Sequence, residues 1–194
     1  MGSQTPSPVL EPARLSVKLE SGDVVLTTFD SRFNTVAKRL TNARYTHAMI
    51  CIDPDTLLDI RRRDLIPSVP LGGALRLINT RDVINTATFE DIAVLRPDDL
   101  DRQRFNALLE ALLTNPPPYS LRRLAITSVT QAFKTPAPGR LAHRFAGPGV
   151  ICSGLVTQLI TTTPTTDIHF ATPDHLRVNP SLTLLAQTPV TLAA

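Results

Sequence analysis

Cysteine and large aromatic residues are scarce in this chain, which has 2 cysteines, 2 tyrosines and no tryptophan among 194 residues. Two cysteines cannot form the disulfide framework that stabilises small secreted proteins, so we expect reduced thiols. No cysteine or histidine group has the paired spacing of a structural zinc site. The sequence therefore predicts neither a metal site nor an organic cofactor.

A strong excess of charge of one sign is also missing. The 20 Lys and Arg residues exceed the 17 Asp and Glu residues by only 3, and aromatic residues do not alternate with the basic ones. This composition excludes a dedicated nucleic-acid-binding protein. The densest basic run, Arg61–Arg63, is predicted to be a solvated loop or strand end, with attraction to an anionic lipid or polymer as the alternative.

Long hydrophobic runs are absent as well. The first 25 residues lack a charged segment followed by an apolar stretch, and no run reaches membrane-spanning length. We therefore expect synthesis in the cytoplasm and no stable membrane insertion. The chain length favours one domain over residues 15–186, with a flexible leader at 1–14 and a C-terminal tail at 187–194.

Strand-forming and helix-forming patterns both occur, which predicts an α+β domain with a small antiparallel sheet packed against helices. Asp98 or Asp99 is predicted to cap the longest helix. The predicted strands cover 23–29, 45–52, 56–60, 75–78 and 92–95. The predicted helices begin near 31, 99, 120 and 152 and have apolar residues at the 3.6-residue period.

Cys152 is the first candidate nucleophile. It lies at the predicted start of a helix, just after the turn-forming Gly147-Pro148-Gly149. Backbone N–H groups at a helix N-terminus stabilise negative charge, which lowers the pKa of a thiol. Cys51 lies in mid-strand without such a terminus, and is predicted to be structural.

A cysteine nucleophile needs a histidine within hydrogen-bond reach and a polar residue that orients the imidazole. His47 lies on a predicted strand, and Asp59 lies on its hairpin partner, where cross-strand neighbours are about 5 Å apart at Cβ. The predicted catalytic order is therefore His47, Asp59, Cys152, and the alternative for Asp59 is that it pairs with Arg61 or caps a turn. His143, His169 and His175 compete as bases, and Tyr45 and Tyr119 either donate to an oxyanion or only pack.

An ordered set of short motifs extends over residues 20–180. It comprises residues 22–26, 31–44, 45–50, 94–97, 118–119, 151–156 and 172–176. In identity and order these motifs resemble the permuted branch of the NlpC-type papain-like superfamily. That branch contains the YiiX-like bacterial hydrolases and the lecithin:retinol acyltransferase relatives. The resemblance implies a permuted papain-like fold with the nucleophile at a helix N-terminus.

Carried over residue by residue, the resemblance assigns the family's nucleophile to Cys152, its histidine to His47 and its variable third polar residue to Asp59. Two positions depart from the common pattern. Gly154 stands where the bacterial relatives commonly have Glu, and Asp59 replaces the more usual Glu or His. The first departure lies outside the three assigned residues, and the second weakens only the assignment of Asp59.

The activity that the resemblance implies is hydrolysis of amide bonds through a thioacyl intermediate, with bacterial cell-wall peptides as the substrate class. Such an enzyme would be exported by a signal-peptide-independent system, as an antibacterial effector with a cognate inhibitor or immunity protein, or would act on an internal substrate. One alternative is a lipid-directed acyl hydrolase or acyltransferase of the lecithin:retinol acyltransferase type. The other is a non-catalytic binding module on the same fold.

Overall fold

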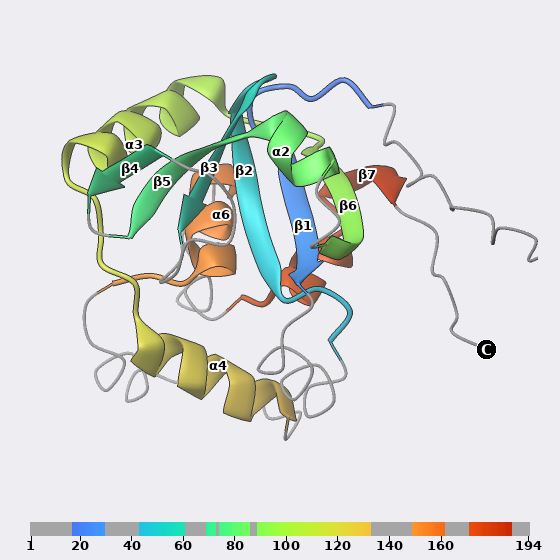
Figure 1. The fold of residues 1–194 in the computed structure, drawn as a ribbon, viewed down its shortest axis with the longest axis vertical. Coiled ribbons are helices and arrows are strands. Elements are labelled where there is room, and N and C mark those ends of the chain that lie inside the picture. Colours follow the sequence, from blue (N-terminus) through green and yellow to red (C-terminus); the bar gives the residue numbers. More distant parts are fainter. Residues whose placement is uncertain are drawn as a thin grey trace, which may run out of the picture.

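A computed structural model of the chain describes residues 17–29, 43–60, 69–72, 74–85, 89–132, 149–161 and 171–187. Within these residues, seven antiparallel strands form one sheet in the order β4-β5-β3-β2-β1-β6-β7 (Figure 1). The strands are β1 (Val24–Phe29), β2 (His47–Asp53), β3 (Thr56–Ile60), β4 (Val69–Gly72), β5 (Leu75–Asn79), β6 (Phe89–Pro97) and β7 (Leu182–Gln187). The described helices are α2 (Thr80–Asn85), α3 (Arg102–Thr114), α4 (Leu121–Ala132), α6 (Cys152–Ile160) and α7 (Pro173–Arg177). The predicted α+β class with an antiparallel sheet is confirmed.

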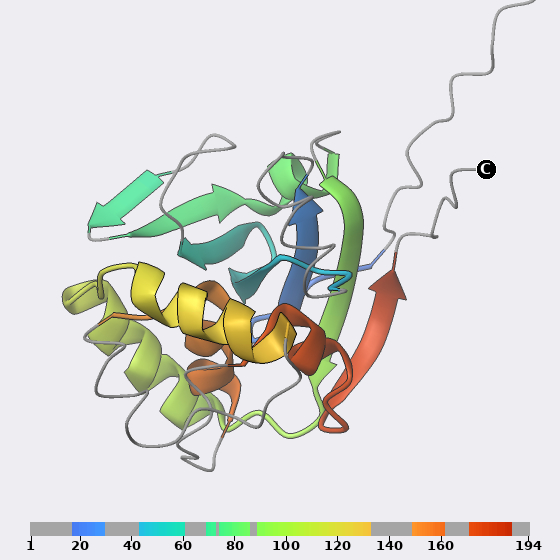
Figure 2. The same cartoon turned by 90° about the horizontal axis from the view of Figure 1, so that it is seen from below.

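Both faces of the sheet are apolar. Successive residues of a strand point to opposite sides of the sheet, so one strand can contribute apolar side chains to both faces. On β1, Val24 and Leu26 belong to a core that includes α6, whereas Val25 belongs to a second core that includes Val83 of α2. The two helices accordingly lie on opposite sides of the sheet in Figures 1 and 2. Each fully buried Val or Leu contributes about 1.5–3 kcal/mol of burial free energy. The central strands are therefore rigid supports for the side chains that they carry.

Helix α6 is buried almost all round. Every residue from Cys152 to Ile160 except Gln158 is buried, including Ser153 and Gly154. A helix that is apolar on all sides belongs inside a protein, and α6 contacts β2, β3, α3 and α7. The predicted buried stripe of this helix is confirmed.

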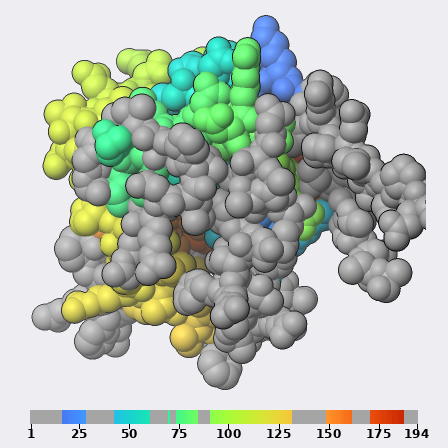
Figure 3. All heavy atoms as spheres, viewed as in Figure 1, coloured from blue at the N-terminus to red at the C-terminus, as the bar shows by residue number. Residues whose placement is uncertain are grey.

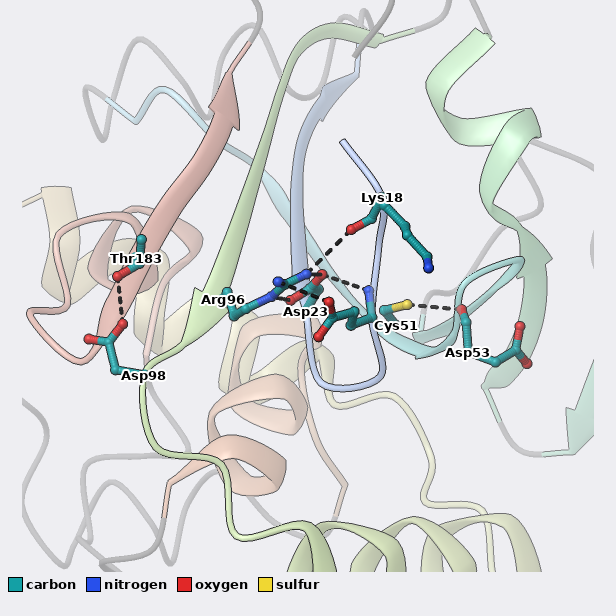
Figure 4. Close-up of polar contacts among 8 residues, drawn as sticks. Lys18, Asp23, Cys51, Asp53, Arg96, Asp98 and Thr183 are labelled. Atoms are coloured by element: carbon teal, nitrogen blue, oxygen red, sulfur yellow. Dashed lines mark hydrogen bonds and ion pairs between the residues drawn. The ribbon is translucent and has the colours of Figure 1, made fainter. Parts of the chain in front are cut away.

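The predicted cap of helix α3 is wrong. The N-cap is Asp101, whose side chain accepts a hydrogen bond from the backbone N–H of Arg104 at 2.9 Å. Asp98 instead accepts from the hydroxyl of Thr183 at 2.5 Å, as Figure 4 shows, and so ties the end of β6 to β7. The pairing of two strands far apart in sequence therefore occupies Asp98, one of the two aspartates that were predicted to cap the helix.

Helix α4 is present as predicted but is less covered than its apolar pattern suggests. Leu121 is 47% exposed and Val129 is 55% exposed. The helix lies at the end of the molecule where β2 and α6 begin (Figure 1), and it forms part of the surface drawn in yellow in Figure 3. An apolar face in the sequence therefore does not by itself mean burial.

Four elements were not expected from the sequence: β4, α2, α7 and β7. Strand β7 completes one edge of the sheet by pairing with β6. The helix expected to begin near residue 31 lies outside the described residues, as do the leader 1–14 and all of the tail except Gln187. In the described part of the chain, no helix has both the length and the apolar character needed to cross a membrane.

Candidate active site

The β2–β3 hairpin brings His47 and Asp59 together. Its register pairs Ile50 with Leu58 and Cys51 with Leu57 across a turn in which the Asp55 backbone N–H donates to the Asp53 carboxylate. His47 Nε2 lies 2.5 Å from Asp59 Oδ1, and both side chains are buried, with 7% and 0% exposed. The predicted contact between these two residues is therefore present in the fold.

The contact determines how the imidazole is used. An ionised carboxylate can only accept a hydrogen bond, so Nε2 carries the hydrogen that points at Asp59. Nδ1 is then the ring nitrogen left to face another group. A ring held in this way has one tautomer and one orientation, which is what general acid–base catalysis requires.

Cys152 occupies the first position of α6, and the chain before it is tightly fixed. Val150 donates to the carbonyl of Pro118 at 3.1 Å and accepts from Ser120 at 2.9 Å. Gly149 has a φ of +101°, and a Cβ there would lie 2.5 Å from the Pro118 carbonyl oxygen. Glycine is therefore required at this turn, and the position at which α6 begins is set by contacts with residues 118–120.

Cys152 is only 5% exposed, yet the pKa of its thiol is lowered. Burial raises the pKa, and this is the largest single influence. The positive charge of His47, a hydrogen bond with the His47 side chain and one with the backbone of Ala48 together lower it by more, while the charge of Asp59 opposes them. The arrangement therefore favours a thiolate paired with an imidazolium.

These three residues supply the groups of cysteine-dependent acyl transfer. A thiolate is the nucleophile, an imidazolium protonates the leaving group, and a carboxylate orients the ring. Ile151, the N-cap of α6, makes no side-chain hydrogen bond to the helix. The first-turn N–H groups of α6 have no partner within the helix and could stabilise an oxyanion.

Cys51 is buried without an activating group. Its Sγ donates to the Asp53 carbonyl oxygen at 2.9 Å (Figure 4). Burial and the negative charges of Asp23 and Asp53 raise its pKa to about 12, against a smaller opposing effect of Arg96. Cys51 is therefore a thiol at neutral pH, in agreement with the structural role expected for it.

The competing residues have other surroundings. His175 Nδ1 accepts from the backbone N–H of Thr172 at 3.3 Å in the capping box of α7. Tyr45 is 1% exposed; burial raises its pKa, and its charged neighbours are Arg44, Asp91, Arg177 and Asp174. The groups that shift the pKa of the Cys152 thiol are His47, Ala48 and Asp59 rather than either of these residues. His143 and His169 lie outside the described residues.

Sequence reasoning missed the backbone of Ala48, which contacts the thiol from the residue next to His47. Only the packing of α6 against β2 creates that contact, so no sequence signal could have revealed it.

No group of three or more His, Cys, Asp or Glu side chains that could hold a metal ion occurs among the described residues. No model of a known protein family matches the chain, and no curated protein matches it.

Proposed function

We propose that the protein is a cysteine hydrolase that cleaves amide bonds, with Cys152 as nucleophile, His47 as general acid and base and Asp59 as the residue that orients His47. The observation that carries the proposal is the convergence of three distant positions on one buried site. Burial alone would raise the pKa of the Cys152 thiol, whereas His47, itself held by Asp59, lowers it. A purely structural cysteine does not need this arrangement.

The reaction follows from the positions of the protons. Cys152 thiolate attacks the amide carbonyl carbon, and the tetrahedral intermediate collapses as His47 imidazolium protonates the leaving amine. This leaves a thioester on Cys152 and a neutral imidazole. The imidazole then takes a proton from water as the oxygen attacks the thioester, which releases the acid and restores the ion pair.

The sequence motifs that resemble the permuted NlpC-type papain-like branch support a permuted papain-like fold for this domain. The histidine and the third polar residue precede the cysteine in the chain, the histidine lies on a strand, and the cysteine begins a buried helix. The class of substrate that this resemblance favours is the peptide of the bacterial cell wall.

A lipid acyl group is the second candidate substrate. The observation that favours it is the exposure of Leu121 and Val129 on α4, which lies at the end of the molecule where β2 and α6 begin. Exposed apolar side chains of this kind can contact an acyl chain or a membrane surface.

Two parallel assays distinguish these candidates. Release of free amines from purified muropeptides supports amide hydrolysis, whereas release of fatty acid from phospholipid vesicles supports the lipid candidate. C152A is the control in both and must be inactive. If neither product forms and the Cys152 thiol has ordinary reactivity that H47A does not change, the domain is a non-catalytic binding module.

A further inference from the structure

Arg76 lies directly opposite Asp59 in the sheet. The antiparallel register of β3 and β5 pairs Asp59 with Arg76, between the pairs Leu58–Leu77 and Ile60–Leu75. Side chains of directly opposite residues lie on the same face, about 5 Å apart at Cβ. Asp59 therefore has a cation next to it on β5 as well as the imidazole on β2.

Both members of this cross-strand pair are buried. Asp59 is 0% exposed and Arg76 is 7% exposed, while the next pair on the same face is the apolar Leu57 and Ile78. Burying a guanidinium or a carboxylate alone is very costly, and each is found inside proteins when the other is near. A buried arginine in a short, largely apolar strand therefore requires a reason, and Asp59 is the charged residue opposite it on β3.

We propose that Arg76 is a positioning residue of the catalytic site, which keeps Asp59 ionised and directed at His47 Nε2. The inference rests on the proposed function, because it assigns Arg76 a role in the same Cys152–His47–Asp59 site. Arg76 acts through Asp59 and touches neither the thiol nor the substrate in this role.

Two consequences follow from the charges. The guanidinium is positive at every relevant pH, so Asp59 stays a hydrogen-bond acceptor whether His47 is charged or neutral. Arg76 also offsets the negative charge of Asp59, which on its own raises the pKa of the Cys152 thiol. The charged and titratable side chains assigned to the site are Cys152 from α6, His47 from β2, Asp59 from β3 and Arg76 from β5.

Loss of the Arg76 charge can have either of two effects on Asp59. If Asp59 stays ionised, its uncompensated charge disfavours the thiolate. If Asp59 takes up a proton, it becomes an uncharged and weaker acceptor for the His47 N–H, and the imidazolium that stabilises the thiolate is less favoured. Both effects reduce the thiolate fraction of Cys152 near neutral pH.

The test is the pH dependence of iodoacetamide alkylation at Cys152, followed by mass spectrometry in the folded full-length protein. We expect R76Q to slow alkylation about tenfold at pH values below the midpoint, which corresponds to a rise of about one pH unit in that midpoint. R76K, which keeps a positive charge, should lie between R76Q and the unchanged protein and provides a second variant if R76Q folds poorly.

Arg96 offers a matched control. It donates to Asp23 at 2.8 Å from Nε and again from a terminal nitrogen, and Asp23 is 1% exposed (Figure 4). R96Q therefore removes an arginine from another buried carboxylate, and we expect lower stability with an unchanged Cys152 profile. In a D59N background, R76Q should have no further effect on the profile, because Arg76 acts through Asp59.

The outcomes are distinguishable. A low midpoint in the unchanged protein that rises in R76Q and less in R76K, but not in R96Q, supports the role of Arg76. A low midpoint that R76Q and R76K leave in place overturns this role and leaves the proposed function standing. An ordinary thiol profile in the unchanged protein overturns the proposed function and the role of Arg76 together.

Discussion

The two cysteines of this chain are almost equally buried but have opposite chemistry. Cys51 is 0% exposed and Cys152 is 5% exposed. The pKa of Cys51 is raised to about 12 by burial and by two carboxylates, whereas that of Cys152 is lowered because His47 and a hydrogen bond from Ala48 outweigh burial. The reactivity of a thiol is therefore decided by the charges and hydrogen-bond donors around the sulfur rather than by burial.

The surroundings of Cys51 have a structural purpose. Asp23, one of the carboxylates that raise its pKa, is held by Arg96 and accepts from the Glu20 backbone N–H at 2.8 Å. The Asp23 carbonyl also accepts from the Cys51 backbone N–H at 2.8 Å. These contacts hold residues 18–23 against the ends of β2 and β6. None of them gives the Cys51 thiol a base that could take its proton and then stabilise the thiolate as a cation.

The largest expected effect separates the two cysteines directly. C152A should reduce amide or ester hydrolysis roughly 10⁴-fold or more, because it removes the nucleophile. C51A should keep hydrolysis within a few-fold of the unchanged protein and cost about 1 kcal/mol of stability through a small cavity. Acylation by p-nitrophenyl acetate and urea unfolding measure the two effects. Equal losses of activity in both variants contradict the comparison.

The next largest effect is expected from loss of His47, the residue that distinguishes the surroundings of Cys152 from those of Cys51. H47A deletes the group whose charge and hydrogen bond lower the pKa of the Cys152 thiol, so that pKa should rise and hydrolysis should fall about 10³-fold. Stopped-flow acylation at several pH values checks both statements. Retention of the low pKa in H47A would show that the backbone of Ala48 alone activates the sulfur.

A smaller effect is expected from D59N. The amide no longer stabilises the imidazolium, so hydrolysis should fall about 10²-fold. Alkylation of Cys152 should slow less than hydrolysis, because loss of the Asp59 charge, a charge that raises the thiol pKa, only partly offsets the weaker imidazolium, which lowers that pKa less. The loss of hydrolysis and the loss of alkylation are compared by measuring p-nitrophenyl acetate turnover and iodoacetamide labelling in one preparation of D59N. A loss confined to labelling contradicts the orienting role.

The smallest effect concerns the position of the thiol. G149A places a Cβ 2.5 Å from the Pro118 carbonyl oxygen at a φ of +101°, which should cost about 1–3 kcal/mol and reduce hydrolysis several-fold. G22A is the matched control, since Gly22 has a φ of +97° and a Cβ there would meet Leu100. Thermal unfolding and acylation should show that both lose stability and that only G149A loses activity.

Local patterns in the sequence were sufficient to predict the contact between His47 and Asp59 and the buried helix that begins at Cys152. The Asp53–Asp55 turn and the alternation on either side of it predict the hairpin that joins His47 to Asp59, and the apolar residues after Cys152 predict a buried helix. These features depend on neighbours in sequence. The order of the three residues could also be read from the chain.

Features that depend on distant partners could not be predicted. The pairing of β3 with β5 places Arg76 opposite Asp59, and the pairing of β6 with β7 takes Asp98 away from the helix cap. The contact between Ala48 and the thiol requires α6 to lie against β2. Each of these arises from tertiary packing, which overrides local propensity.

The most direct test labels both cysteines of the folded protein in one sample over a range of pH, with iodoacetamide and quantification of each cysteine by mass spectrometry. A lowered pKa predicts that Cys152 is alkylated at pH values below 9.0, the ordinary pKa of the thiol, and a pKa of about 12 predicts that Cys51 remains unlabelled through pH 9. If Cys152 stays unlabelled in folded protein at neutral pH, or if both cysteines react with the same pH dependence, the central claim is wrong.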